Sequence, residues 1–295
     1  MKTMRRFSKQ FISAAVILSL LFFTGPAQAA YSTSFQSGTI QVITPNSTGI
    51  SINGILHVEG FSTLQKVWLC VRGPQGELVV YPAEVQDGSF SLDINLRFGN
   101  GLYTIWLGES ATKFDGKIRF EVINTQSQDN RYLAPSAYVD STNPAIVSLA
   151  KEIVGDEQSD YGKLQAIHSW VTNNISYDYN AYLGGNDMVL AASQTLQDRS
   201  GICRNYSFLV AALCRAVGLP TKVVYGEAWA TSEWAAQKHA WNEVYVGGRW
   251  VTLDATWDAG FIRDAAFVQA PSTRFFDPGS AVFAETHSDA TVTLH

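Results

Sequence analysis

The stretch GICRNYSFLVAALCRAVGLP, residues 201–220, decides how this 295-residue chain is interpreted. Its apolar residues recur at helical spacing and predict a buried stripe: Ile202, Leu209, Leu213 and Val217. The ending Gly218-Leu219-Pro220 is typical of a helix C-terminus. Cys203 then lies in the first helical turn, where the amide groups carry partial positive charge and favour a thiolate. An inert buried cysteine is the alternative, and the polar pair Arg204-Asn205 beside it argues against a sealed position.

Two segments further along predict a β-hairpin, with arms at 239–246 and 249–255 around a Gly-Gly turn. Counting back from a two-residue turn places Trp241 opposite Asp254. His239 is two residues from Trp241 and shares its face, so His239 and Asp254 are diagonal neighbours within side-chain reach. The other face is apolar and predicts a core contact: Val244, Val246, Val251 and Leu253.

These three residue types in this order can form a nucleophile, a base and its orienting carboxylate. Cys203 would attack an amide carbonyl, His239 would take the thiol proton and later protonate the leaving amine, and Asp254 would orient the imidazole. A structural role for His239 is the alternative. Asp258 is a second candidate for the carboxylate, but it lies beyond the countable hairpin, so we favour Asp254. The product is a thioester that water or an amine resolves.

The segment from Tyr161 to Thr256 resembles the transglutaminase-like superfamily, whose active-site layout is similar to that of papain-type proteases. The motifs that carry the resemblance are Trp170-Val171 and Tyr177, Gly201-Ile202-Cys203, Gly218-Leu219-Pro220, His239-Ala240-Trp241 and Asp254-Ala255-Thr256. Ala255 stands where the family often has proline. The tail, with Arg274-Phe275-Phe276, Phe283 and Thr286-His287, resembles the ending of bacterial members. The resemblance implies a Cys-His-Asp triad on a small α+β fold, and leaves open whether the chain is a crosslinker, a protease, a deamidase or an inactive relative.

Two aromatic residues are further candidates at the site. Tyr177 would contribute a hydroxyl near the oxyanion, or would be a core tyrosine after a helix. Trp241 is a candidate substrate contact, because five of the eight tryptophans fall between Trp229 and Trp257. Such an aromatic wall could exclude water, bind an extended peptide or a cell-wall glycan, or fill the core.

The first 29 residues predict a signal peptide. A basic head precedes an apolar run from Phe11 to Phe23, and Ala27-Gln28-Ala29 offers a cleavage site. An uncleaved anchor is the alternative. Cleavage would leave 17 basic and 26 acidic residues, a net charge of −9. We therefore expect a secreted, extracellular or wall-associated protein that binds neither nucleic acid nor, after cleavage, a membrane.

The pattern of the remaining chain predicts two domains. About seven short strands over 39–124 indicate an immunoglobulin-like β-sandwich, a polar segment at 125–143 reads as a linker, and 144–295 forms an α+β domain with a C-terminal extension. Three helices are expected in this domain. The first begins after Asn143, the second begins at Ser159 or Asp160, and the third runs from about 187 to 196.

Cysteine and histidine usage narrows the chemistry. Cys203 and Cys214 are too far apart along one helix to pair, and Cys70 and Cys214 are interpreted as buried filler. The five histidines show no ligand spacing, so we expect no metal and no cofactor.

The sequence thus favours an extracellular cysteine enzyme acting on peptide or glutamine amide bonds in a protein or peptide substrate. The alternative is a catalytically inactive module that binds protein or cell wall and keeps the fold.

Overall fold

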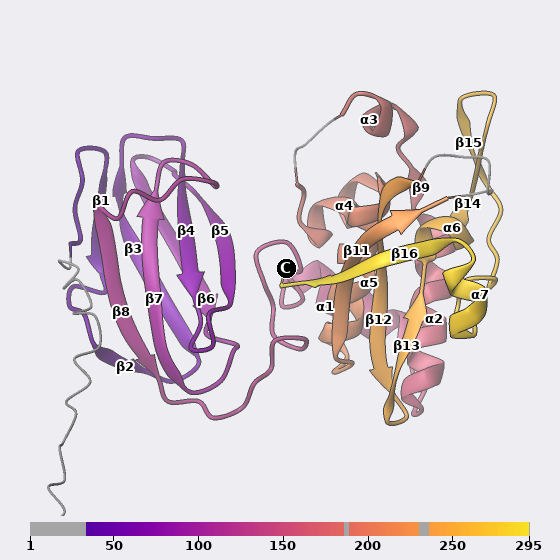
Figure 1. The fold of residues 1–295 in the computed structure, drawn as a ribbon, viewed down its shortest axis with the longest axis horizontal. Helices are drawn as coiled ribbons and strands as arrows, with labels where there is room; N and C mark the ends of the chain where they lie inside the picture. The colour runs from indigo at the N-terminus through magenta and orange to yellow at the C-terminus, as the bar shows by residue number, and fades with distance from the viewer. Residues whose placement is uncertain (1–33, 186–188, 230–235, 295) are drawn as a thin grey trace, which may run out of the picture. The chain divides into compact units, whose positions relative to one another are not determined.

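The computed structural model describes residues 34–185, 189–229 and 236–294, so the expected signal peptide lies outside the described residues. Within those ranges, every helix is too short or too polar to cross a membrane. The fold is α+β: strands fill the region up to Asn124, and helices join strands from Pro144 onward (Figure 1).

The N-terminal region is a β-sandwich built from two sheets. One sheet has the order β1 (Ile40–Thr44), β3 (Ile55–Ser62) and β6 (Ser89–Asn95). The other has the order β2 (Ile50–Ile52), β8 (Ile118–Asn124), β7 (Gly101–Gly108), β4 (Lys66–Arg72) and β5 (Leu78–Glu84). Alternate residues of these strands point inward and form one core, whose largest members include Leu56, Leu69, Tyr103, Ile105 and Phe120.

β2 and β3 are close in sequence but belong to different sheets. Gly54 adopts a left-handed φ of 82° between them and turns the chain. β2 then pairs in parallel with β8, whereas β3 pairs with β1 and β6. The region 39–124 therefore has eight strands instead of about seven. His57 is exposed on β3, and its Nδ1 lies 2.7 Å from Asp93 Oδ1.

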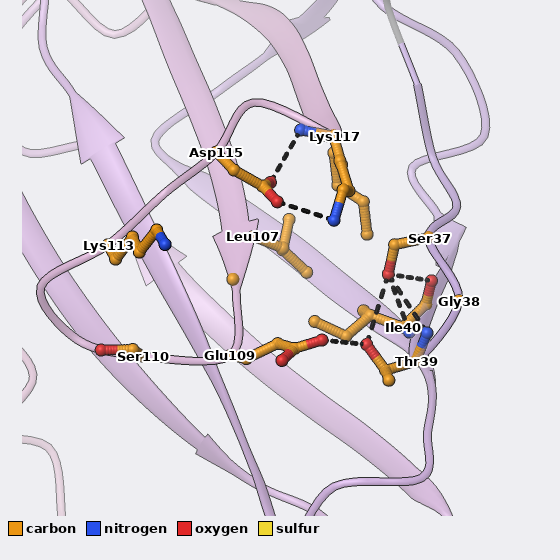
Figure 2. Close-up of a pocket in the computed structure, with 12 residues that line it drawn as sticks. Ser37, Gly38, Thr39, Ile40, Leu107, Glu109, Ser110, Lys113, Asp115 and Lys117 are labelled. Carbon is orange, nitrogen blue, oxygen red and sulfur yellow. Dashed lines mark hydrogen bonds and ion pairs between the residues drawn. The ribbon is translucent and has the colours of Figure 1, made fainter.

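This sandwich has a pocket of about 410 Å³. Figure 2 shows the residues that line it. The pocket lies between the chain at 37–40 and the β7–β8 connection. Thr39 donates to Glu109 at 2.6 Å, and Lys117 pairs with Asp115 at 2.9 Å. Its twelve lining residues include no cysteine and no histidine, the residue types of the predicted nucleophile and base.

Three helices of the second region surround its core. Asn143 caps α1 (Pro144–Val154), Ser159 caps α2 (Asp160–Asn174), and α5 spans Cys203–Ala216. All but the ends of α5 are buried, because α1, α2 and α4 pack on it from one side and the sheet from the other. Gly218 adopts a φ of 84° after α5, as expected for a helix-ending glycine.

The second region also contains shorter helices and strands. They are α3 (Tyr179–Leu183), α4 (Ala192–Asp198), α6 (Ala255–Ala259), α7 (Ser280–Ala284), β9 (Ser176–Tyr177), β10 (Ser200–Gly201), β14 (Gly260–Arg263) and β15 (Ala266–Gln269). α4 ends at Asp198 where the sequence predicts 196, and residues 187 and 188 of that expected helix lie outside the described residues.

A four-stranded antiparallel sheet supports the site. Its order is β13 (Arg249–Leu253), β12 (Gln237–Val246), β11 (Thr221–Ala228) and β16 (His287–Thr293). Gly247 and Gly248 both have positive φ, which gives the tight turn that sets the β12–β13 register. Val246 pairs with Arg249 as the two-residue turn requires, and the predicted core face is buried. β16 lies beside β11 (Figure 1), a pairing that the sequence does not predict.

Candidate active site

Cys203 is the first residue of α5 and is half-buried. The Asn205 side chain accepts from the Ile202 backbone N–H at 3.0 Å, which fixes the chain as it enters the helix. The thiol therefore lies at the positive end of the helix dipole, among N–H groups that point along the axis. This setting suits an anionic sulfur and a developing oxyanion.

His239 and Asp254 lie together, as the hairpin register predicts. His239 Nε2 is 2.8 Å from Asp254 Oδ2, and both side chains are buried. Asp254 follows the end of β13 and caps α6, where its Oδ1 accepts from the backbone N–H groups of Thr256 and Trp257 at 2.9 and 3.2 Å. One carboxylate oxygen thus anchors the residue and the other faces the imidazole.

His239 also interacts with Cys203, which places the imidazole between the acid and the thiol. Burial pulls the pKa of His239 down, but the charge and hydrogen bond of Asp254, with help from Cys203, outweigh burial and raise it to about 10. The same pairing overcomes the effect of burial on Asp254 and holds its pKa well below the usual range. The imidazole is therefore protonated at neutral pH and can stabilise a thiolate.

Asp258, the second candidate carboxylate, forms a pair of its own. Its Oδ2 is 3.0 Å from Nε2 of His168, a buried residue of α2. Its Oδ1 accepts from the backbone N–H of Phe275 and from the hydroxyl of Ser272. Asp258 thus joins α2 to the chain at 272–275, and Asp254 is the carboxylate that orients His239.

The structure places the two aromatic candidates differently. Tyr177, on β9, lies near the sulfur: burial first and the charge of Cys203 second raise its pKa far above the usual range, so its hydroxyl keeps a proton to donate. Trp241 is buried, and its ring lies 6.3 Å from His239, 5.2 Å from His287 and 5.6 Å from Phe283. Trp241 also lines a pocket of about 430 Å³ with His287 and Phe283, so a substrate contact of Trp241 stays a prediction.

Gly226 makes room for Trp241, which gives a first prediction. A Cβ at Gly226 would overlap the Trp241 ring and the Ser288 carbonyl oxygen. We expect Gly226→Ala to lower the free energy of unfolding by about 1–3 kcal/mol, measured by urea denaturation. Gly279→Ala, where a Cβ meets open space, is the matched control and should leave that free energy nearly unchanged. Equal stability of the two variants would show that β16 does not hold Trp241 in this packing.

His287 is a residue of the site that motif reasoning did not assign. It begins β16, is 4% exposed, and its Nε2 lies 3.3 Å from the same Asp254 Oδ2 that faces His239. The available signal was weak: the Thr286-His287 pair resembles the ending of bacterial members, but nothing in the spacing from Asp254 predicts a contact.

The nitrogen and oxygen atoms of His239, Asp254 and His287 that could bind a metal ion lie within 4.8 Å of one another. Among the residues that the structure describes, these three form the cluster with metal-binding spacing. The sequence predicts no metal, because the three positions are far apart in the chain. Both imidazoles already face the Asp254 carboxylate, which compensates its buried charge by hydrogen bonding.

Comparison with known proteins finds relatives of the region that contains this site. Residues 147–255 match the model of the transglutaminase-like superfamily. The chain is 26% identical over 147 residues to kyphoscoliosis peptidase of Mus musculus, and the match covers 47% of this chain and 22% of the relative. It is 23% identical over 188 residues to the uncharacterized protein YebA of Bacillus subtilis, and this match covers 58% of this chain and 25% of the relative. The chain thus spans about a quarter of the length of these curated relatives.

Solved structures that the chain partly resembles include a cysteine protease candidate from Cytophaga hutchinsonii. It has a TM-score of 0.39 and 21% identity, with 89% of this chain and 80% of that chain covered. Red sea bream transglutaminase has a TM-score of 0.32 and 10% identity, and the match covers 75% of this chain and 51% of that chain. The family match contains all of α5 and the hairpin with Cys203, His239 and Asp254. Residues 147–255 of this chain therefore form a transglutaminase-like domain.

Proposed function

We propose that the protein is a cysteine-dependent acyl-transfer enzyme that acts on peptide or glutamine amide bonds in proteins. The observation that carries this proposal is the position of Cys203 at the start of α5 beside the buried His239–Asp254 pair, in which Nε2 lies 2.8 Å from Oδ2. The similarity to kyphoscoliosis peptidase of Mus musculus and of Homo sapiens supports amide-bond chemistry.

The reaction follows from the positions of the three groups. The Cys203 thiolate attacks the carbonyl carbon, and the oxygen takes the electron pair of the π bond as an oxyanion. N–H groups at the start of α5 and the Tyr177 hydroxyl can donate hydrogen bonds to this oxyanion. The C–N bond then breaks as His239 gives its proton to the leaving amine. The thioester is resolved when water or a second amine attacks and His239 takes up a proton again.

The test is selective alkylation of the folded protein with iodoacetamide at neutral pH. Cys203 is half-buried beside a protonated imidazole and should react. Burial raises the pKa of both Cys70 and Cys214, the latter to about 12, so these two thiols are internal controls that should react only after denaturation. An unlabelled Cys203 in the native protein, with labelling after denaturation, would favour an inactive binding module instead.

The products distinguish the reactions within the class. A glutamine-containing protein and a fluorescent amine would be incubated with the enzyme. Incorporation of the amine indicates transamidation, new N-termini indicate proteolysis, and ammonia release without incorporation indicates deamidation. We favour an extracellular or wall-associated substrate on the strength of the N-terminal 29 residues, and secretion of the full chain with loss of that segment would test it.

A further inference from the structure

Asp254 Oδ2 is shared by two imidazoles. His239 Nε2 lies 2.8 Å from it and His287 Nε2 lies 3.3 Å from it, and all three side chains are buried. With the two backbone donors on Oδ1, this carboxylate has four hydrogen-bonding partners. An ionised carboxylate only accepts, so Nε2 of His287 carries a proton.

The surroundings of His287 restrict its tautomer and its plane. Its Nδ1 lies 2.9 Å from the Thr286 hydroxyl, whose other acceptor, the Phe283 carbonyl oxygen, is farther away at 3.4 Å. Donation along the shorter contact leaves the proton of the ring on Nε2. Its ring stacks on Phe283, with centroids 3.9 Å apart and planes 11° apart, and lies 4.7 Å from Trp257. The ring is therefore held rigidly with one N–H directed at the acid of the site.

We propose that His287 is a positioning residue that divides the hydrogen bonding of Asp254 Oδ2 and thereby limits how tightly His239 keeps its proton. This inference rests on the proposed function of Cys203 and His239. His287 belongs to β16, which lies beyond the segment 147–255 that matches the superfamily.

The physical reason is the strength of the acid that His239 must be. The leaving amine needs a proton from His239, and a general acid works best when its pKa lies near the operating pH. The pKa of His239 is already raised to about 10. A second N–H on Oδ2 withdraws charge from the bond to His239, because hydrogen bonds to one acceptor atom compete. Without it, His239 would hold its proton more tightly and donate it more slowly.

Other charged groups near His287 are engaged with one another. The adjacent pocket of about 430 Å³ includes Glu243, Arg249, Asp277 and Asp289 in its lining. Glu243 pairs with Lys222 at 2.8 Å and Arg249 pairs with Asp277. Asp254 and His239 are thus the titratable groups that face the imidazole of His287 directly, and Asp289 follows it on the same strand.

The experiment compares the full-length wild type with two variants of opposite design. His287→Phe keeps a ring to stack on Phe283 but removes the N–H. His287→Gln keeps an amide N–H near the position of Nε2 but removes the titratable ring. Proton NMR of protein labelled with ¹⁵N-histidine reports the ring N–H of His239 at neutral pH. We expect that resonance to move downfield in His287→Phe, because its bond to Asp254 strengthens, and to stay close to the wild-type position in His287→Gln.

A second readout is the pH dependence of Cys203 alkylation by iodoacetamide. The wild-type profile should show a step near pH 10, where His239 loses its proton. The raised pKa keeps the imidazole charged below that pH. The step should move upward by about half a unit to one unit in His287→Phe, a threefold to tenfold change in proton affinity, and should be restored in His287→Gln.

The outcomes separate this inference from the proposed function. A wild-type Cys203 that iodoacetamide does not modify defeats the proposed function. A reactive Cys203 whose profile and His239 resonance are the same in wild type and His287→Phe defeats the role of His287. If His287→Phe does not fold, the wild-type spectrum still decides: a His287 ring protonated at Nδ1 instead of Nε2 overturns the proposal.

Discussion

Replacing Cys203 with alanine is expected to abolish acyl transfer, with a loss in turnover of about 10⁵–10⁶-fold, as for the nucleophile of other hydrolytic triads. The reason is that the thioester cannot form without the sulfur, while His239 and Asp254 alone offer no nucleophile at the start of α5. Amine incorporation, new N-termini and ammonia release would all be followed with the same substrate. Because Cys203 is half-buried at a helix end, we expect the free energy of unfolding to change by less than about 1 kcal/mol.

Cys70→Ala is the matched control for this experiment. It removes a buried thiol from β4 of the sandwich, outside the site, and should keep wild-type turnover per folded molecule. Cys203→Ser should behave like the alanine variant, because a serine hydroxyl does not ionise at this position as a thiol does. Substantial turnover in both Cys203 variants would show that the chemistry proceeds without the sulfur.

Replacing Asp254 with asparagine is expected to lower turnover by about 10⁴-fold, the size of effect seen when an orienting aspartate is made neutral. The carboxylate accepts from two backbone N–H groups on Oδ1 and faces two imidazoles on Oδ2. An amide has one acceptor oxygen, so it can serve only one of these two sets. We also expect a loss of about 3 kcal/mol or more in the free energy of unfolding, because buried donors lose their partner.

Asp258→Asn is the control that separates orientation from folding. Asp258 is equally buried and also contacts an imidazole and a backbone N–H, but its partners are His168 and Phe275. Its replacement should destabilise the protein to a similar extent and leave turnover per folded molecule within about tenfold of wild type. Equal losses of turnover in the two asparagine variants would assign the effect to stability alone.

Local signals made much of the site predictable. A glycine on each side of α5 and the proline after it bound the helix, and so place Cys203 in its first turn. The Gly247-Gly248 turn fixes the β12–β13 register, and this register alone brings His239 within reach of Asp254. Each of these signals lies within a few residues of the structure that it determines.

Contacts between distant segments were not predictable in this way. β16 pairs with β11 about 65 residues earlier in the chain, and neither strand carries a mark of its partner. His287 reaches Asp254 only through that pairing, so its role could not be read from spacing. α6 is five residues long, too short for a periodic pattern, which hid the capping role of Asp254. Gly54 can be seen in the sequence as a site where the strand could break. The change of sheet that follows it depends on packing between distant segments.

The double duty of Asp254 has a consequence for how relatives of this protein are interpreted. A descendant that abandoned catalysis would be free to lose the sulfur of Cys203, which supports little of the fold. It would still be under selection to retain the aspartate, because without it the start of α6 and the hairpin edge would come apart. An aspartate retained at this position therefore indicates a folded domain. Only the cysteine and His239 together indicate a catalytically active domain.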